Sequence, residues 1–316
     1  MNDRQPDAPA GSDLRLSEHA LAPTGAAVVA TVMWAAGNLI VVGVDMPGSQ
    51  LAFWRTLLGA ATFQAIFRLR GGRMSMDTIR TAAFGGASFG VSAVLFFSAF
   101  KATTVASATV IAALQPVLLL PYSVKRLGEQ VDAAKVALVG LAVLGTAAVV
   151  LSSSDSSGDW SLRGDLLAVG GTLAGCAYFV GTKRARETLG AIEYQGAALV
   201  VGALVALVAT FVVGPGLSVP TGADLGAAAL MVAIPGTGHV LMSWSQKHLA
   251  VSDTATIALG VTVLSSLGAA VFYDQELGPV QLVGMALVLL SLAIFVRRAS
   301  GVPPVDPAEV PVTPGE

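Results

Sequence analysis

The sequence contains little cysteine and little charge. Its single cysteine, Cys176, cannot form a disulfide bond within the chain. Only 12% of the 316 residues are charged, against about 25% in typical soluble domains. The net charge is −2 and the basic residues form no cluster, so we expect no nucleic-acid partner. A chain this poor in charge suits a lipid environment better than water.

Histidine is scarce as well. His19, His239 and His248, together with one cysteine, do not show the spacing of metal ligands. We therefore expect no metal site, and no cofactor of any kind.

Hydrophobic residues, in contrast, make up 54% of the chain and give a mean hydropathy of +0.73. Stretches of about twenty residues with few or no charges, the length that spans a bilayer core, recur along the whole sequence. They predict an all-α integral membrane protein whose partner is the lipid bilayer. The ten predicted transmembrane helices are residues 25–44, 49–69, 81–100, 103–124, 133–152, 164–182, 193–213, 224–246, 253–273 and 278–296.

The loops between these spans differ in their content of lysine and arginine. Alternate loops and the terminal segments hold fifteen of the eighteen basic residues, whereas the other loops hold only Lys101 and Arg163, and Arg55 lies inside a span. Basic residues are retained on the cytoplasmic side of a membrane. We therefore expect both termini in the cytoplasm and Lys101 on the opposite face.

One pattern occurs twice in the chain. Residues Leu95–Val117 and Leu241–Val263 align at an offset of 146, with Lys101 opposite Lys247 between two apolar runs. An offset of 146 residues carries five spans, and because five is odd, the second half enters the membrane in the opposite orientation. Inverted repeats of this kind are typical of transporters that open a central site alternately to either face.

Short motifs within each half resemble the drug/metabolite transporter superfamily, specifically its ten-span EamA-type members. The matching positions are Trp34–Asn38 (WAAGN), Leu51–Arg55 (LAFWR), Ala106–Pro116 (ASATVIAALQP), Gly128-Glu129 and Gly145. The resemblance covers the chain from Gly25 to Arg298.

The resemblance implies two five-span repeats, at residues 25–152 and 164–298, joined by a linker at 153–163. Residues 1–24 and 299–316 are then disordered cytoplasmic tails. It further implies transport of small organic metabolites, often export of amino acids or related compounds, across a bacterial inner membrane.

The second half departs from the family pattern at two positions. Thr262 replaces the proline expected opposite Pro116, and Gln275 replaces the glutamate expected opposite Glu129. Because proline disturbs a helix, we expect the two halves to be unequal, with the first-half hairpin the more strongly bent.

Polar side chains at membrane depth usually face the bundle interior or a wet cavity. Asn38, Gln64, Gln115 and His239 are such residues, and each of them either binds substrate or forms a simple hydrogen bond between helices. We select Asn38, Gln115, Pro116 and His239 as candidate substrate-binding residues.

Two of these candidates adjoin helix-disturbing sequence. Gln115 precedes Pro116, and His239 follows Pro235–Gly238, which the repeat places opposite Phe89–Ser92 beside Gly90. Because matched interruptions in two repeats indicate a midplane site, we expect spans three, four, eight and nine to line the pathway. By resemblance, spans one and six complete its wall.

Four aromatic residues are further candidates for the substrate site: Trp34, Phe97, Tyr178 and Trp244. Their flat faces suit organic cations and rings. Packing in the core is the alternative for each of them.

Arg55 is the one cation predicted away from the ends of a span. We interpret it as a structural residue that extends to the headgroups or forms an ion pair. The alternative is a contact with an anionic group of the substrate.

The carboxylates all fall at span ends or in loops, so proton coupling through a deeply buried acid is not expected. A channel is one alternative function, although no charge ring or filter sequence supports it. An intramembrane serine hydrolase is another, because Gly86–Gly90 (GASFG) fits a nucleophile-elbow pattern with Ser88 as nucleophile and His239 as base. We expect no catalytic residue, since that motif lies in an apolar helical run.

Overall fold

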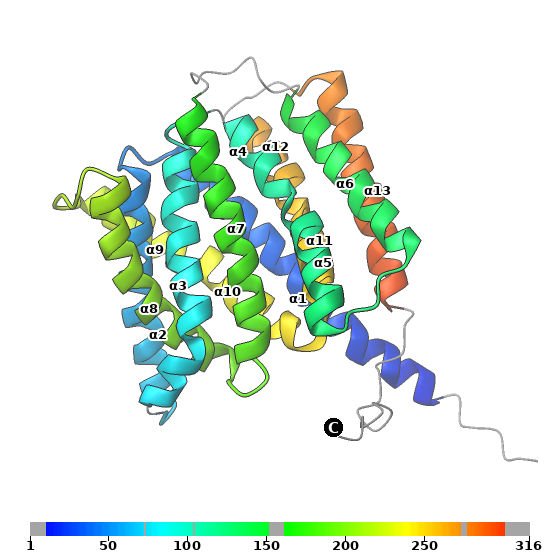
Figure 1. Ribbon diagram of the computed structural model, residues 1–316, viewed down its shortest axis with the longest axis horizontal. Coiled ribbons are helices and arrows are strands. Elements are labelled where there is room, and N and C mark those ends of the chain that lie inside the picture. Colours follow the sequence, from blue (N-terminus) through cyan, green and yellow to red (C-terminus); the bar gives the residue numbers. More distant parts are fainter. Residues whose placement is uncertain (1–10, 73, 104, 152–160, 273–276, 301–316) are drawn as a thin grey trace, which may run out of the picture.

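The computed structural model describes residues 11–72, 74–103, 105–151, 161–272 and 277–300. Within these residues the chain forms thirteen α-helices and no strand (Figure 1). The helices are α1 (Gly11–Val42), α2 (Gly48–Leu69), α3 (Met76–Ala99), α4 (Val105–Ala113), α5 (Gln115–Leu127), α6 (Ala133–Leu151), α7 (Leu162–Ala185), α8 (Ala191–Val213), α9 (Gly222–Ala233), α10 (Pro235–His248), α11 (Val251–Ala258), α12 (Gly260–Phe272) and α13 (Pro279–Ser300).

Three pairs of consecutive helices each form one broken span, namely α4 with α5, α9 with α10, and α11 with α12. The thirteen helices therefore make ten membrane-crossing segments in the described part of the chain. Eight segments are long and apolar enough to span a bilayer, and Ala133–Val149 in α6 is a shorter apolar helix. The tenth, α2, has 22 residues and includes polar side chains such as Gln50, Arg55 and Gln64. The prediction of an all-α membrane protein with two five-span repeats is confirmed.

The helix contacts follow the symmetry that inverted repeats require. By the 146-residue offset, α7 is the counterpart of α1, α8 of α2, α9 with α10 of α3, α11 of α4, α12 of α5 and α13 of α6. Helix α1 packs on α10 as α7 packs on α3, α1 packs on α11 as α7 packs on α4, and α1 packs on α12 as α7 packs on α5. Helices α2 and α8, and likewise α6 and α13, pack directly on their own counterparts. The two repeats are thus related by a pseudo-twofold axis between them.

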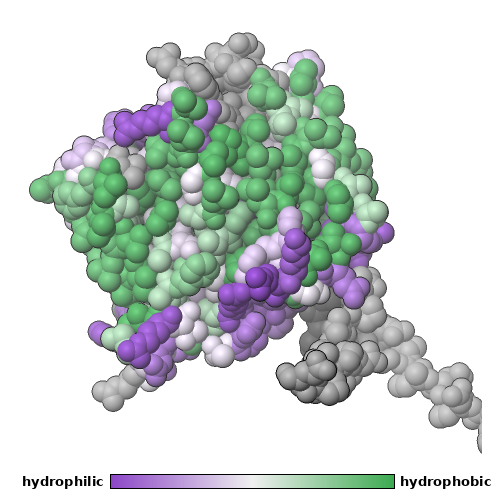
Figure 2. All heavy atoms as spheres, in the orientation of Figure 1, coloured by the Kyte–Doolittle hydropathy of each residue, from purple (hydrophilic) through white to green (hydrophobic). Residues whose placement is uncertain are grey.

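The two ends of the bundle differ in charge. Helix α1 begins and α13 ends at the same end (Figure 1), which also holds Lys125, Arg126 and Lys135; we call this the basic end. At the opposite end, the Lys101 end, the Lys101 ammonium donates to the Val44 carbonyl over 2.8 Å. Figure 2 shows a broad hydrophobic band between polar patches near the two ends. This band is the surface that a bilayer would cover.

Glycines allow α3 to approach α8 closely. A Cβ at Gly90 would lie 2.5 Å from the Gly202 carbonyl oxygen, and one at Gly86 would lie 2.5 Å from the Ala198 carbonyl oxygen. Both distances are shorter than real Cβ contacts, so these positions require glycine. The GASFG pattern is therefore a helix-packing motif inside the continuous helix α3, and Ser88 does not lie on a strand-to-helix turn.

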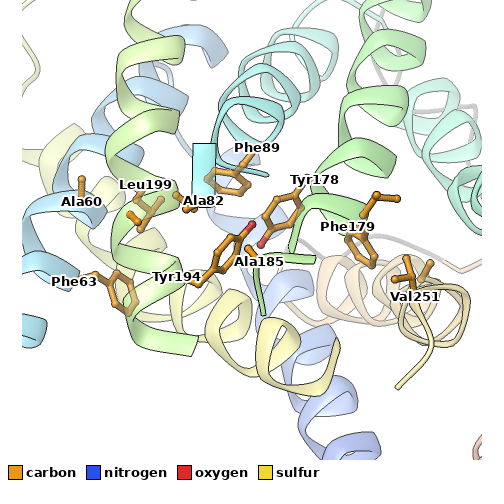
Figure 3. Close-up of a cluster of buried hydrophobic side chains, with 14 of the residues drawn as sticks. Ala60, Phe63, Ala82, Phe89, Tyr178, Phe179, Ala185, Tyr194, Leu199 and Val251 are labelled. Atoms are coloured by element: carbon orange, nitrogen blue, oxygen red, sulfur yellow. The ribbon is translucent and has the colours of Figure 1, made fainter. Parts of the chain in front are cut away.

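A buried cluster joins α3, α7 and α8 on one side of the bundle (Figure 3). Tyr194 is completely buried there, and its hydroxyl lies 2.7 Å from the Thr182 hydroxyl. Tyr178, Phe89 and Phe179 belong to the same cluster. It connects the first repeat to the second beside the molecular centre.

The first helix starts earlier than expected. The sequence predicts a disordered segment over residues 1–24, but α1 already begins at Gly11. Leucine, alanine and glutamate in this stretch favour a helix, so the span continues beyond the membrane. Similarly, α13 extends to Ser300. Residues 1–10, 301–316 and most of the predicted linker, 152–160, lie outside the described residues.

Candidate functional site

A cavity of about 240 Å³ lies between the two repeats. Its wall contains residues from spans one, three, four, six, eight and nine, and also Arg55 from α2. The structure brings seven of the eight predicted substrate-binding residues together in this wall: Trp34, Asn38, Phe97, Gln115, Pro116, Tyr178 and His239.

Trp244 does not lie in the cavity wall. Its ring packs against His248, with centroids 5.0 Å apart, near the end of α10. Trp244 and His239 are five residues apart on one helix, so they face different directions. Gln64 is likewise absent from the wall.

His239 is the centre of an aromatic group that reaches it from three other helices. Its ring centroid lies 4.8 Å from that of Trp34 on α1 and 4.9 Å from that of Phe89 on α3. Tyr178 on α7 places its hydroxyl 3.2 Å from His239 Nδ1. The four side chains form one side of the cavity, and the Tyr178–His239 hydrogen bond joins α7 to α10.

Of the other polar groups in the wall, some have a hydrogen-bond partner and some do not. Asn38 donates from Nδ2 to Ser265 Oγ over 3.2 Å, which links α1 to α12. Trp34 Nε1 and Gln115 Nε2, in contrast, are buried and have no hydrogen-bond partner among the described residues. A buried donor without a partner costs about 1–3 kcal/mol. Two residues of the cavity wall thus each carry a buried donor that has no acceptor among the described residues.

The broken helices meet this cavity. The break between α4 and α5 is at Leu114, whose N–H bonds to Ile111 O, three residues earlier, over 3.2 Å. The break between α11 and α12 is at Leu259, which the 146-residue offset places one residue away, and its N–H bonds to Thr256 O over 3.1 Å. Both spans thus tighten by a single short turn at nearly equivalent positions of the two repeats.

The expected inequality of the two halves is not seen in these breaks, because the second half breaks without a proline. Thr254 and Thr256 donate to the Val251 and Ser252 carbonyls over 2.9 and 2.7 Å. Such side-chain bonds to the preceding turn compete with the backbone and bend helices. Threonines in α11 therefore accompany a break like the one that Pro116 favours in the first half.

The interruption expected in span three is absent. Helix α3 is continuous through Gly90, which packs against Gly202 instead of lining the cavity. Its counterpart span does break, at Ile234, immediately before Pro235. Since proline lacks the N–H of a regular helix and glycine retains it, only the proline copy is interrupted.

Arg55 lies in the cavity wall and is only 7% exposed. Its guanidinium carbon is 5.4 Å from the Phe89 ring centroid and 5.6 Å from that of Phe97. Among the described residues it forms no hydrogen bond or ion pair. The predicted ion pair or headgroup contact is therefore not what the structure shows.

Burial of the Arg55 charge carries an energetic cost. An unpaired cation at membrane depth costs about 2.5–3.5 kcal/mol or more. The cation–π interaction with each aromatic face stabilises the charge by about 0.5–2 kcal/mol. The two rings together can offset a cost of this size, but they supply no hydrogen-bond acceptor to the five N–H donors of the guanidinium.

Sequence reasoning missed several residues of the wall, in particular Phe89, Ser92, Phe96 and Phe100. These four recur at intervals of three and four along α3 and its cap, so they share one helix face, and Phe97 lies next to Phe96 in the same wall. That periodicity is visible in the sequence, but an aromatic stripe at helical spacing also fits an ordinary core.

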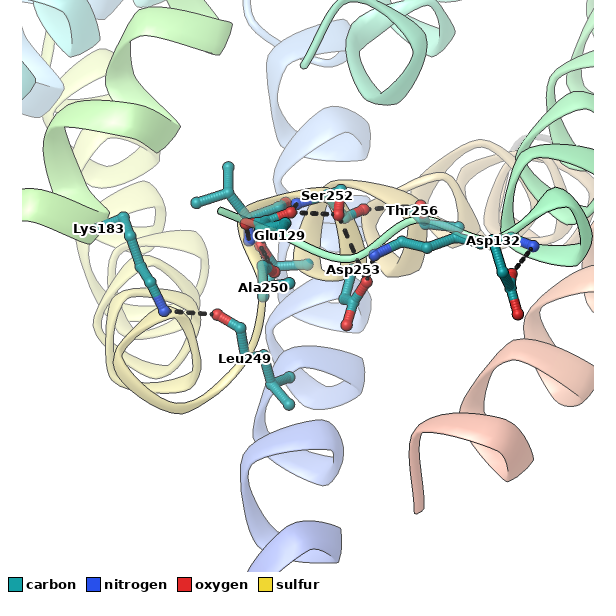
Figure 4. A network of polar contacts seen from close by, with 11 residues as sticks. Glu129, Asp132, Lys183, Leu249, Ala250, Ser252, Asp253 and Thr256 are labelled. Carbon is teal, nitrogen blue, oxygen red and sulfur yellow. Dashed lines mark hydrogen bonds and ion pairs between the residues drawn. The ribbon is translucent and has the colours of Figure 1, made fainter. Parts of the chain in front are cut away.

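A polar cluster joins the repeats at the basic end (Figure 4). Gly128 ends α5 with a φ of +66°, which favours glycine, and the chain then turns so that Glu129 reaches the start of α11. The Glu129 carboxylate accepts from Val251 N–H over 2.5 Å, from Ser252 N–H over 3.3 Å and from Ser252 Oγ over 2.5 Å. A carboxylate at a helix N-terminus also interacts favourably with the helix dipole.

Two further contacts belong to the same cluster. Lys135 forms an ion pair with Asp253, and both side chains are mostly buried. Lys183 donates to the Leu249 carbonyl over 2.8 Å. We call Glu129, Lys135, Ser252 and Asp253 the latch; none of them lines the cavity.

Comparison with known proteins identifies the family. The model of the EamA-like transporter family matches residues 24–151 and again residues 162–297. The chain belongs to the EamA-like transporter family. It is therefore a multi-pass membrane transporter built from two copies of the EamA unit.

Structural comparison supports the fold of this EamA-like protein. One solved crystal structure aligns with a TM-score of 0.71 and 20% sequence identity, over 89% of this chain and 98% of the other. No curated protein matches the sequence. The substrate has to be inferred from the cavity itself.

Proposed function

We propose that this EamA-like protein carries a small organic metabolite, related to amino acids, across a bacterial inner membrane by alternating access. The observation that carries the proposal is the central cavity between two inverted repeats, at which the matched spans break at Leu114 and Leu259. By the distribution of basic residues, the basic end and both termini face the cytoplasm. The direction that fits the family is export or exchange.

The two ends of the pathway differ in a way that supports alternating access. The wall extends through Phe96 and Phe97 to Phe100 at the Lys101 end, whereas the latch connects the repeats at the basic end. Glu129 and Lys135 belong to the first repeat, and their partners belong to the second. A rocking motion that opens the basic end has to break these contacts. The latch therefore favours a carrier over a channel-like facilitator.

Transport by purified protein in proteoliposomes tests the proposal, with a metabolite screen to find a substrate. Gln115→Ala and His239→Ala should each lower the initial rate roughly 2- to 12-fold, since each removes a hydrogen-bonding group worth about 0.5–1.5 kcal/mol. Trp244→Ala is the matched control, because Trp244 shares α10 with His239 but lies outside the cavity. It should transport like the wild type.

Two results would contradict the proposal. If Gln115→Ala and His239→Ala both transport like the wild type, the cavity is not the substrate-binding site. A flux that never saturates, accompanied by electrical conductance, would support the channel instead.

A further inference from the structure

The cavity holds a positive charge without a counter-charge. Arg55 is more than nine-tenths buried and lines the cavity, and its guanidinium carbon lies over the rings of Phe89 and Phe97. A guanidinium carries five N–H donors in a planar fork that matches a carboxylate. The two rings supply no hydrogen-bond acceptor, and among the described residues no other group accepts from the Arg55 guanidinium.

The surrounding groups do not neutralise this charge. Tyr178 and His239 are near enough for the charge of Arg55 to act on them, but they hydrogen-bond each other. In the described part of the chain no aspartate or glutamate lines the cavity. The potential inside the cavity is consequently positive.

The unsatisfied hydrogen-bonding atoms point to the same chemistry. Trp34 Nε1 and Gln115 Nε2 are both donors, and both are buried without a partner among the described residues. A molecule that supplies acceptor atoms would satisfy them, whereas one that supplies only donors would not. The remaining wall is aromatic or small and apolar, notably Phe96, Phe97 and Ala112.

We propose that the transported molecule is an organic monocarboxylate with an apolar or aromatic body, whose carboxylate pairs with Arg55. The inference rests on the proposed transport function and specifies its substrate class. The donors of Trp34 and Gln115 bind the polar atoms of the substrate, and the rings of α3 contact its body. Simple organic cations, which the aromatic residues alone would accommodate, are excluded by the charge of Arg55.

A phosphate ester fits this cavity less well than a carboxylate. A phosphate monoester carries nearly two negative charges near neutral pH. Arg55 is the one cation in the described wall, so it would compensate only half of that charge. One cation and about 240 Å³ match a small molecule with a single acidic group.

Three probes with the same body separate the effect of charge from that of shape. They are 3-phenylpropanoate, 3-phenylpropanamide and 3-phenylpropylamine, each added to the purified full-length protein in detergent. Binding is measured by calorimetry and by the shift in melting temperature. We expect the acid to bind at least tenfold more tightly than the amide, and the amine not to bind.

Variants of Arg55 test whether the preference for the acid over the amide depends on this residue. Arg55→Gln should weaken acid binding roughly 10- to 100-fold, the value of a charge-assisted hydrogen bond, and leave amide binding unchanged. Arg55→Lys should restore part of the affinity. Arg184→Gln is the matched control, because Arg184 also lies over a ring, that of Tyr122 at 5.8 Å, but outside the cavity. It should bind the acid like the wild type.

Folding of the variants is checked in the same experiment. Because Arg55 is a buried, unpaired cation, Arg55→Met should raise the melting temperature of the ligand-free protein while abolishing the preference for the acid. A variant that is merely misfolded would instead melt at a lower temperature.

The outcomes are distinct from those of the transport assay. Four results would overturn the inference. The amide binds as tightly as the acid, the amine binds tightly, the acid does not bind at millimolar concentration, or Arg55→Gln keeps the preference for the acid. Saturable transport of a metabolite that has no carboxylate would overturn it too, yet leave the carrier function intact. If the acid binds in an Arg55-dependent way but the protein transports no metabolite, the proposed binding site stands and the carrier function is wrong.

Discussion

Linking the two repeats covalently through the latch is expected to abolish transport. In the structure Ser252 Oγ donates to a Glu129 carboxylate oxygen over 2.5 Å, so cysteines at these two positions lie within reach of a short bis-methanethiosulfonate reagent. A carrier has to separate these residues to open its cavity to the basic end. In a Cys176→Ala background, the linked Glu129→Cys/Ser252→Cys protein should show only the flux of empty liposomes, and reduction should restore transport.

A second cysteine pair controls for the chemistry of the linker. Asp77 and Arg80 form an exposed ion pair within α3 at the basic end, and both belong to one repeat. Linking Asp77→Cys to Arg80→Cys should leave the rate unchanged. If the linked latch protein transports as fast as the unlinked one, the basic end does not open in the way we describe.

Replacing Tyr194 by alanine is expected to have the largest effect on stability. Tyr194 is fully buried between α3, α7 and α8, bonds to Thr182, and contacts Gly85 where α3 passes. Deleting a buried aromatic side chain costs about 3–5 kcal/mol. Thermal unfolding of Tyr194→Ala in detergent should therefore begin at a clearly lower temperature, and the yield of folded protein should fall.

Two further substitutions divide this effect into its parts. Tyr194→Phe keeps the ring and removes the hydroxyl that bonds to Thr182, so we expect a loss of only about 1 kcal/mol. Phe211→Ala removes a ring from the same helix at a position that is 62% exposed, and it should change stability by less than about 0.5 kcal/mol. A Tyr194→Ala protein as stable as Phe211→Ala would show that the cluster contributes little.

The architecture could be predicted from the sequence because transmembrane spans and internal repeats are visible as patterns along the chain. Hydrophobic runs of bilayer length and one offset of 146 residues predict two inverted repeats, and the family model and the helix contacts agree. The broken span at Pro116 also follows from its sequence, since proline removes a backbone donor. The equivalent break at Leu259 could not be predicted in this way. It accompanies hydrogen bonds from threonine hydroxyls to backbone carbonyls of the preceding turn, and threonine is also common in apolar helices that do not break.

The surroundings of the Arg55 side chain could not be predicted from the sequence. The sequence places a cation inside a span, but whether it meets a headgroup, a carboxylate or a cavity depends on the neighbours that α3 brings to it. The latch is similar, since Glu129 and Val251 are 122 residues apart. Trp244 shows the opposite failure, because an aromatic residue close to His239 in sequence lies on another face of the helix. Long-range pairing decides the first two cases, whereas the position of Trp244 follows from the periodicity of its own helix.

The most direct test of the account is the side-specific reactivity of one cysteine in the cavity. Thr262 lines the cavity on α12, so a Thr262→Cys protein in the Cys176→Ala background can be labelled with a membrane-impermeant maleimide from either face. We predict that Glu129→Gln, which weakens the latch, raises the labelling rate from the basic face and lowers it from the Lys101 face. Opposite changes are the signature of one cavity that opens to one face at a time. A rate that rises at both faces together, or changes at neither, would contradict it.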